Sequence, residues 1–112
     1  MSTPINKNPK QLEWTDPTTY EDGTPFGASE FKAYELGAAQ EVDGEITPLL
    51  VLPTAYGVGA SPIPDAVVDV KDRIQWIALR TIAKTDEVSD WSGRLAVMYT
   101  RVPLAPSAFS AT

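Results

Sequence analysis

The chain has 112 residues, a formal net charge of −6, and neither cysteine nor histidine. A chain of this length forms one domain that buries about two-thirds of the surface of its unfolded state, without disulfides or structural metal. The missing imidazole and thiol groups exclude histidine-based triads, thiol redox chemistry and the usual structural zinc sites. The composition therefore favours a binding or structural module over most classes of small enzyme.

The charged residues are unevenly distributed along the chain. Nine carboxylates lie between residues 13 and 45, where Lys32 is the one basic residue. Basic residues form no run that could follow a phosphate backbone, so we expect no binding of nucleic acid. Two interpretations of the pattern stay open: a solvated acidic face with ordinary ends, or basic termini that dock on acidic neighbours in a repeating assembly.

Residues 1–7 lack the apolar segment of a secretory signal, so we expect the chain to be made and retained in the cytoplasm. The longest uncharged stretch, residues 46–64, contains four of the ten prolines. Because proline breaks helices, we expect no membrane-spanning helix and no membrane partner.

In the first half of the chain the pattern predicts three strands. Residues 11–15 form the first, which a long proline-containing loop follows. Residues 30–36 form the second, and Gly37 interrupts it. Residues 47–52 form a largely apolar third strand, and its proline favours a position at the edge of a sheet.

The only long proline-free stretch, residues 65–102, predicts three further strands. These cover residues 66–70, 75–83 and 94–100. A polar hairpin loop at 84–90 separates the last two. A helix over residues 74–84 also fits the apolar spacing, but β-branched and aromatic residues favour a strand there. Six or seven short strands separated by turns are typical of an antiparallel β-sandwich.

Two stretches of the chain resemble fibronectin type III domains. Residues 12–18, LEWTDPT, and DGTP at 22–25 resemble the second strand and following loop of that family, with Trp14 packed between the sheets. Tyr34 lies where the third strand of the family carries its core tyrosine. Residues 77–92 resemble the penultimate strand and the hairpin that follows it.

The resemblance implies an all-β fold, an antiparallel immunoglobulin-like sandwich of about seven strands over residues 11–101. Residues 1–10 would form an N-terminal arm or first strand, and residues 102–112 an extended tail. The family places a tyrosine near the start of its sixth strand, where this chain has Gln75. In this register Trp76 faces outward, whereas a shift by one residue would bury it and expose Ile77.

The carboxylates do not predict a catalytic or metal site. The densest clusters, residues 21–23 and 43–45, lack the alternating acidic ligands and terminal glutamate of a calcium loop, so we expect solvated turns. A small sandwich also rarely has the deep cleft in which a carboxyl group acts as a general acid. We therefore expect no enzyme activity, no metal and no cofactor.

Three features are candidates for binding a partner. Residues 102–112 contain two prolines and no charge, which predicts an extended segment, either a disordered remnant or an arm along a neighbouring subunit. The uncharged loop at 51–64 either packs on the domain or contacts protein. Trp91 either closes the end of the sandwich or contacts a partner. The candidate partner-binding residues are Leu104, Phe109, Arg101, Tyr56, Val58 and Trp91.

The resemblance also implies a setting. Tailed-phage virion proteins commonly carry domains of this kind and are made in the host cytoplasm without signals. We therefore expect a virion structural protein, a capsid decoration or cementing protein that binds the major capsid protein, another virion protein or copies of itself through its termini and apolar loop. The alternative is a carbohydrate- or cell-surface-binding accessory module of a phage tail or baseplate, which would use exposed aromatic residues such as Trp76.

Overall fold

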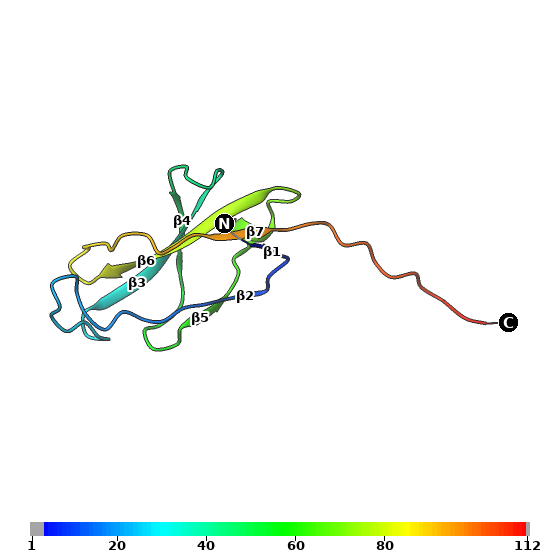
Figure 1. Cartoon of the computed structure of the whole chain (residues 1–112). Coiled ribbons are helices and arrows are strands. Elements are labelled where there is room, and N and C mark those ends of the chain that lie inside the picture. The colour runs from blue at the N-terminus through cyan, green and yellow to red at the C-terminus, as the bar shows by residue number, and fades with distance from the viewer. Residues whose placement is uncertain (1–3, 112) are drawn as a thin grey trace.

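The computed structural model describes residues 4–111, and within them the chain forms seven strands and one short helix (Figure 1). In chain order these are β1 (Ile5–Lys7), β2 (Gln11–Glu13), β3 (Phe31–Ala39), β4 (Thr47–Leu52), β5 (Ala60–Pro62), α1 (Asp65–Val68), β6 (Ile74–Ala83) and β7 (Leu95–Met98). A five-stranded sheet has the order β1-β7-β6-β3-β4, and a two-stranded sheet contains β2 and β5. The β1–β7 pair is parallel and the other pairs are antiparallel. The predicted all-β class is confirmed.

Most of the predicted strands are present. β4 has the predicted bounds and lies at the edge of the large sheet. The strands predicted at 11–15 and 94–100 are found in the shorter β2 and β7. Residues 5–7, at the N-terminal end of the described chain, form β1 and pair with β7.

The predicted strand at residues 66–70 is wrong, because the segment begins with the single turn of α1. Pro64 precedes this turn in an extended conformation, and its carbonyl accepts the Val67 N–H at 3.0 Å. Proline is well suited to the start of a helical turn because its φ angle is already fixed. The turn buries the side chain of Val67 completely in the core. The β-branched residues at 66–70 can therefore contribute to the core without forming a strand.

Gly37 does not interrupt its strand, contrary to the prediction, and β3 continues to Ala39. A Cβ atom at position 37 would lie 2.6 Å from Ile46 Cγ2 and 2.8 Å from Trp91 Cη2. Glycine is therefore required here for close packing on the outer face of the sheet, since both neighbours rest directly on the strand backbone.

β6 runs over Ile74–Ala83 as a strand, so the alternative helix is excluded and the strand prediction is confirmed. Gln75 is 2% exposed, and its Nε2 atom donates a hydrogen bond to the Val67 carbonyl at 3.0 Å. Trp76 is half-buried on the opposite face, across from Ala39 and Ala96. The register with Trp76 outward and Ile77 inward is therefore correct.

The core lies on the inner face of the large sheet, along the β3–β6 pair. Leu36 lies opposite Leu79, and Tyr34 lies opposite Thr81. The small sheet adds Leu12 from β2 to the same hydrophobic cluster. β5 lies in the segment predicted as a loop at 51–64, which is a further correction. This strand was not recognised because it has only three residues and one of them is a proline.

Asp16 links three segments at the edge of this core. Its carboxyl group accepts hydrogen bonds from Trp14 Nε1 at 3.1 Å, from the Gly57 N–H at 3.0 Å and from the Tyr34 hydroxyl. Burial, and then the bond to Asp16, raises the pKa of Tyr34, so that its hydroxyl stays protonated as a donor. Trp14 contacts the Tyr34 ring edge-on, with the two ring centroids 5.1 Å apart. Trp14 is half-buried, so it lies at the edge of the core, whereas the sequence predicted a position between the sheets.

The close packing at Gly37 predicts a position-specific effect of substitution. Gly37→Ala should lower the free energy of unfolding by about 1–3 kcal/mol, because the new methyl group displaces Ile46 and Trp91. Gly93→Ala is the matched control, since a Cβ atom there meets nothing within 4 Å, and it should change stability by less than about 0.5 kcal/mol. Urea unfolding measures both, and equal stability of the two variants would contradict the packing described.

Candidate interaction site

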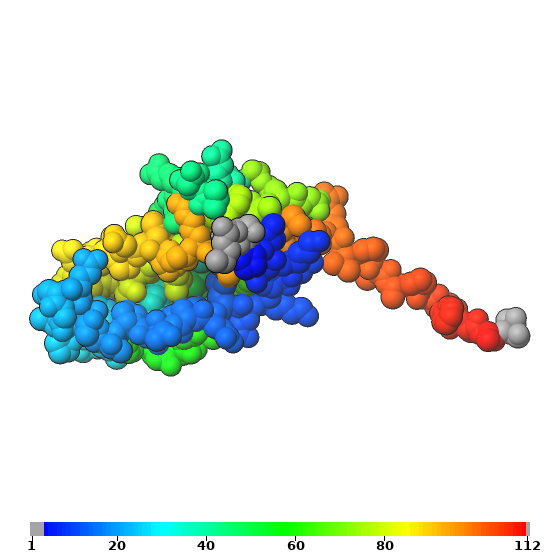
Figure 2. All heavy atoms as spheres, in the orientation of Figure 1, coloured from blue at the N-terminus to red at the C-terminus, as the bar shows by residue number. Residues whose placement is uncertain are grey.

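The C-terminal tail separates from the body of the molecule after β7. Residues 101–111 are all exposed, and the segment runs away from both sheets (Figures 1 and 2). Leu104 and Phe109 are each 95% exposed. Over residues 101–111 the tail forms no helix or strand, and it bends at Ser107–Ala108, where Ala108 has a φ of 55°. Two large apolar side chains thus stand in solvent on a segment without charge.

The point at which the tail leaves the body is held by several hydrogen bonds. Asn8 Oδ1 accepts the Thr100 N–H at 3.0 Å, and Asn8 Nδ2 donates to Thr100 Oγ1 at 3.1 Å. The Tyr99 hydroxyl donates to the Pro9 carbonyl at 2.6 Å. Arg101 forms an exposed ion pair with Asp72 at 3.5 Å. These contacts fix the start of the tail against the chain that follows β1 and against Asp72, which precedes β6.

The loop between β4 and β5 exposes one of its two candidate residues. Val58 is 60% exposed near the tip of the loop. Tyr56 packs against Phe26 and Phe31 in the core, and its hydroxyl donates to the Pro17 carbonyl at 2.7 Å. Tyr56 therefore stabilises the loop, and Val58 is the side chain that the loop presents to solvent.

Trp91 lies on the outer face of the large sheet, where it rests on Gly37. The guanidinium of Arg80 stacks on its ring, with Arg80 Cζ 4.4 Å from the ring centroid. Arg80 in turn donates from Nε to Glu35 Oε1 at 2.7 Å. These contacts leave Trp91 half-buried, and they place it on the sheet face rather than at an end of the molecule. The six candidate residues therefore do not form one site.

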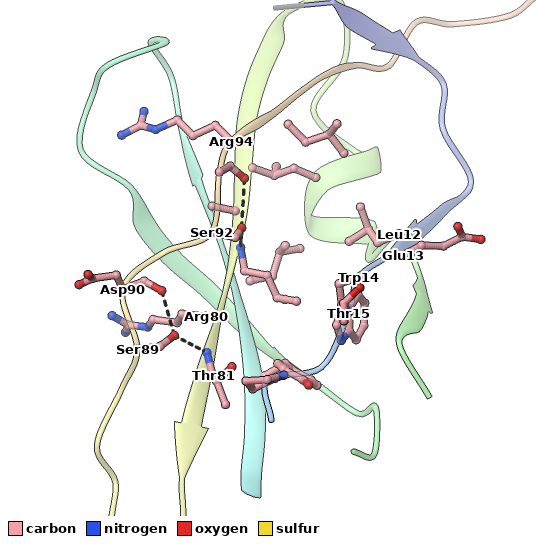
Figure 3. Close-up of a pocket in the computed structure, with 18 residues that line it drawn as sticks. Leu12, Glu13, Trp14, Thr15, Arg80, Thr81, Ser89, Asp90, Ser92 and Arg94 are labelled. Carbon is pink, nitrogen blue, oxygen red and sulfur yellow. Dashed lines mark hydrogen bonds between the residues drawn. The ribbon is translucent and has the colours of Figure 1, made fainter. Parts of the chain in front are cut away.

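The sequence did not predict a groove of about 640 Å³ on the inner face of the large sheet. One bank is formed by residues 12–15 and the other by residues 89–94 (Figure 3). The apolar side chains of its lining are Leu12, Trp14, Pro17, Tyr34, Leu36, Ile77, Ala78, Leu79 and Leu95. Within this lining Leu95 is exposed and Trp14, Pro17 and Leu79 are half-buried, whereas the other five side chains are buried.

Two serines hold the second bank against the edge of β6. The Ser92 hydroxyl accepts the Leu79 N–H and the Ser89 hydroxyl accepts the Thr81 N–H, both at 2.9 Å. The backbone N–H groups of the same serines donate to the carbonyls of Leu79 and Thr81. The segment thus satisfies the edge of β6 without forming a regular strand.

The acidic residues stay dispersed over residues 4–111, where no three of them gather as ligands for a cation. Asp22 lies in an exposed turn, and hydrogen bonds from the Thr24 hydroxyl and N–H lower its pKa. Over the same residues, no helix is long and apolar enough to cross a membrane.

Comparisons with protein-family models, with curated proteins and with solved structures give no match to this chain. The surfaces of the chain itself therefore carry the functional interpretation.

The exposed tail predicts that its removal leaves the body intact. Deletion of residues 102–112 should shift the melting temperature by less than about 2 °C, because residues 102–111 bury nothing against the sheets. Tyr99→Phe is the contrasting variant, and loss of its bond to the Pro9 carbonyl should cost about 1 kcal/mol. Calorimetry measures both variants, and a melting temperature that falls as far in the deletion as in Tyr99→Phe would contradict this description.

Proposed function

We propose that this chain is a non-catalytic structural protein of a virion, a capsid decoration or cementing protein that attaches through its tail and its exposed apolar loop. The observation that carries the proposal is the tail itself, with Leu104 and Phe109 almost fully exposed on an uncharged segment. A soluble monomer gains nothing from this exposure, whereas a subunit of an assembly buries such an arm on a neighbour.

The strand order supports an immunoglobulin-like interpretation of the fold. In that interpretation the sequence β7-β6-β3-β4 corresponds to strands G, F, C and C′ of a variable-type domain, and the β2–β5 pair corresponds to B and E. Gln75 takes the place of the corner tyrosine, because its amide also bonds to a backbone carbonyl upstream, that of Val67. These correspondences support a domain class that is common among phage virion proteins.

The proposed mechanism of attachment is the burial of apolar surface at several weak contacts. Leu104, Phe109 and Val58 offer exposed apolar side chains on two separate segments. Contacts of this size are weak singly, but many copies on one shell hold one another in place by multivalency. The proposed mechanism assigns no catalytic role to any residue.

The alternative of a carbohydrate-binding module has less support. Sugar-binding platforms need exposed aromatic faces. Tyr56 is half-buried and packs against the core, and the guanidinium of Arg80 stacks on the Trp91 ring. Trp76 is half-buried on the outer face of the large sheet, across from Ala39 and Ala96.

The proposal predicts that purified particles contain this chain at a copy number that matches their capsid lattice. Quantitative mass spectrometry of particles from the source of the chain measures that number. Particles stripped of the chain should also bind the full chain again, and should bind a Leu104→Asp/Phe109→Asp variant at least about tenfold more weakly, because the arm then carries charge where it should be buried.

Ser107→Asp/Ser110→Asp is the matched control, since it adds the same charge to the same tail and removes no apolar side chain. Absence of the chain from capsids, or its presence in a few copies at the end of a tail, would contradict the proposal. Specific binding to immobilised glycans would favour the alternative.

A further inference from the structure

We propose that the groove between residues 12–17 and residues 89–95 binds the proline-rich tail of a second copy of this chain. The proposal deepens the proposed function, because it identifies the neighbour of the arm as another copy. It rests on the proposed function in one respect, namely that the tail buries its apolar side chains on a neighbouring subunit. The two surfaces that would bind each other are the groove and the exposed apolar tail, and every copy of the chain carries both.

The groove has the character of a site for an extended apolar segment. Its floor follows β6 from Ile77 to Thr81, a distance of about 13 Å along the strand. Trp14, which is half-buried, contributes aromatic surface to its lining. Leu95, at the other end, is 37% exposed although its side chain is on the inner face, across from Ile77. An occupant of the groove would bury the accessible parts of Trp14, Leu79 and Leu95.

The tail has the matching chemistry. Pro103-Leu104-Ala105-Pro106 has the spacing of a PxxP segment, which favours a polyproline II conformation with both prolines on one face. The two prolines are then about 9 Å apart, which is within the length of the groove floor. Such segments bind aromatic-lined grooves with a small entropic cost because their conformation is already formed. Proline has no N–H group to donate to a sheet, but binding of a polyproline II segment in a groove requires no strand pairing.

The tail cannot place this segment in the groove of its own molecule. Leu95 begins β7 at the groove, and Arg101 follows six residues later, about 20 Å away along the extended chain. Leu104 reaches at most about 10 Å from Arg101. The tail also points away from the body in the structure (Figure 1). The segment therefore meets the groove of another copy, and successive copies join head to tail.

Two variants with one defect each test this pairing in the full-length chain. Leu104→Asp keeps the groove and loses the tail anchor, whereas Leu95→Asp keeps the tail and introduces a charge into the groove. Sedimentation velocity across a dilution series should show self-association of the unmodified chain. Each variant alone should associate at least about tenfold more weakly, because a carboxylate cannot be buried in the contact. An equimolar mixture should form a one-to-one dimer, since one intact tail and one intact groove remain.

Matched controls keep the test specific. Ser110→Asp adds a charge to the tail, and Val42→Asp adds one to the exposed β3–β4 connection, and both should associate as the unmodified chain does. Thr15→Arg, at an exposed position of the groove bank, replaces Leu95→Asp if that variant fails to fold by circular dichroism.

Two results would overturn the pairing. One is an unmodified chain that stays monomeric at millimolar concentration, and the other is a groove variant that associates as well as the unmodified chain. Neither result depends on a capsid, so failure of the pairing in solution is distinguishable from failure of capsid attachment.

Discussion

The inner face of the large sheet is larger than the small sheet that packs on it, and this mismatch determines the rest of the structure. β3 and β6 have nine and ten residues, whereas β2 and β5 have three each. Burial of apolar surface is the main favourable term in folding, and it is proportional to the area removed from water. Two short strands can therefore complete the core around Tyr34, Leu36 and Ile77, but they leave Leu79 and Leu95 partly exposed.

The place where the small sheet stops is set by hydrogen bonds between distant segments. After Glu13 the chain turns towards Asp16, which holds Trp14, Tyr34 and the Gly57 backbone together. On the other bank, Ser89 and Ser92 occupy the edge of β6 that a longer β7 would otherwise pair with. The groove is thus a fixed consequence of the fold, bounded by satisfied backbone groups rather than by loose chain. In the pairing that we propose, the exposed apolar tail of another copy occupies this groove.

The sequence contained enough local information for most of the large sheet. Alternation in β6 was sufficient to turn Ile77 inward and Trp76 outward, and Pro48 identified β4 as an edge strand because proline has no N–H for a second neighbour. The strand predicted at residues 66–70 was wrong because β-branched side chains fit a buried turn as well as a strand. Pro64, which precedes the turn, favours the start of a helix there.

The requirement for Gly37 could not be predicted from the sequence, since it depends on Ile46 and on Trp91, which is 54 residues away. The groove was missed for the same reason, because its banks come from opposite ends of the chain. Prolines and missing charge are local signals that point to an extended tail, whereas the contacts of Tyr56 with Phe26 and Phe31 are not local and could not be predicted from the sequence.

The proposed binding of the tail of one copy in the groove of another can be tested in solution. The most direct measurement is a dilution series of the isotope-labelled full-length chain, followed by NMR through its backbone amide chemical shifts. Binding of the tail in the groove should give concentration-dependent shifts confined to residues 12–17, 77–81 and 89–95 and to the tail after Arg101. Shifts concentrated on the outer edge of β4 or on the Trp91 face, with the groove residues unchanged, would contradict it.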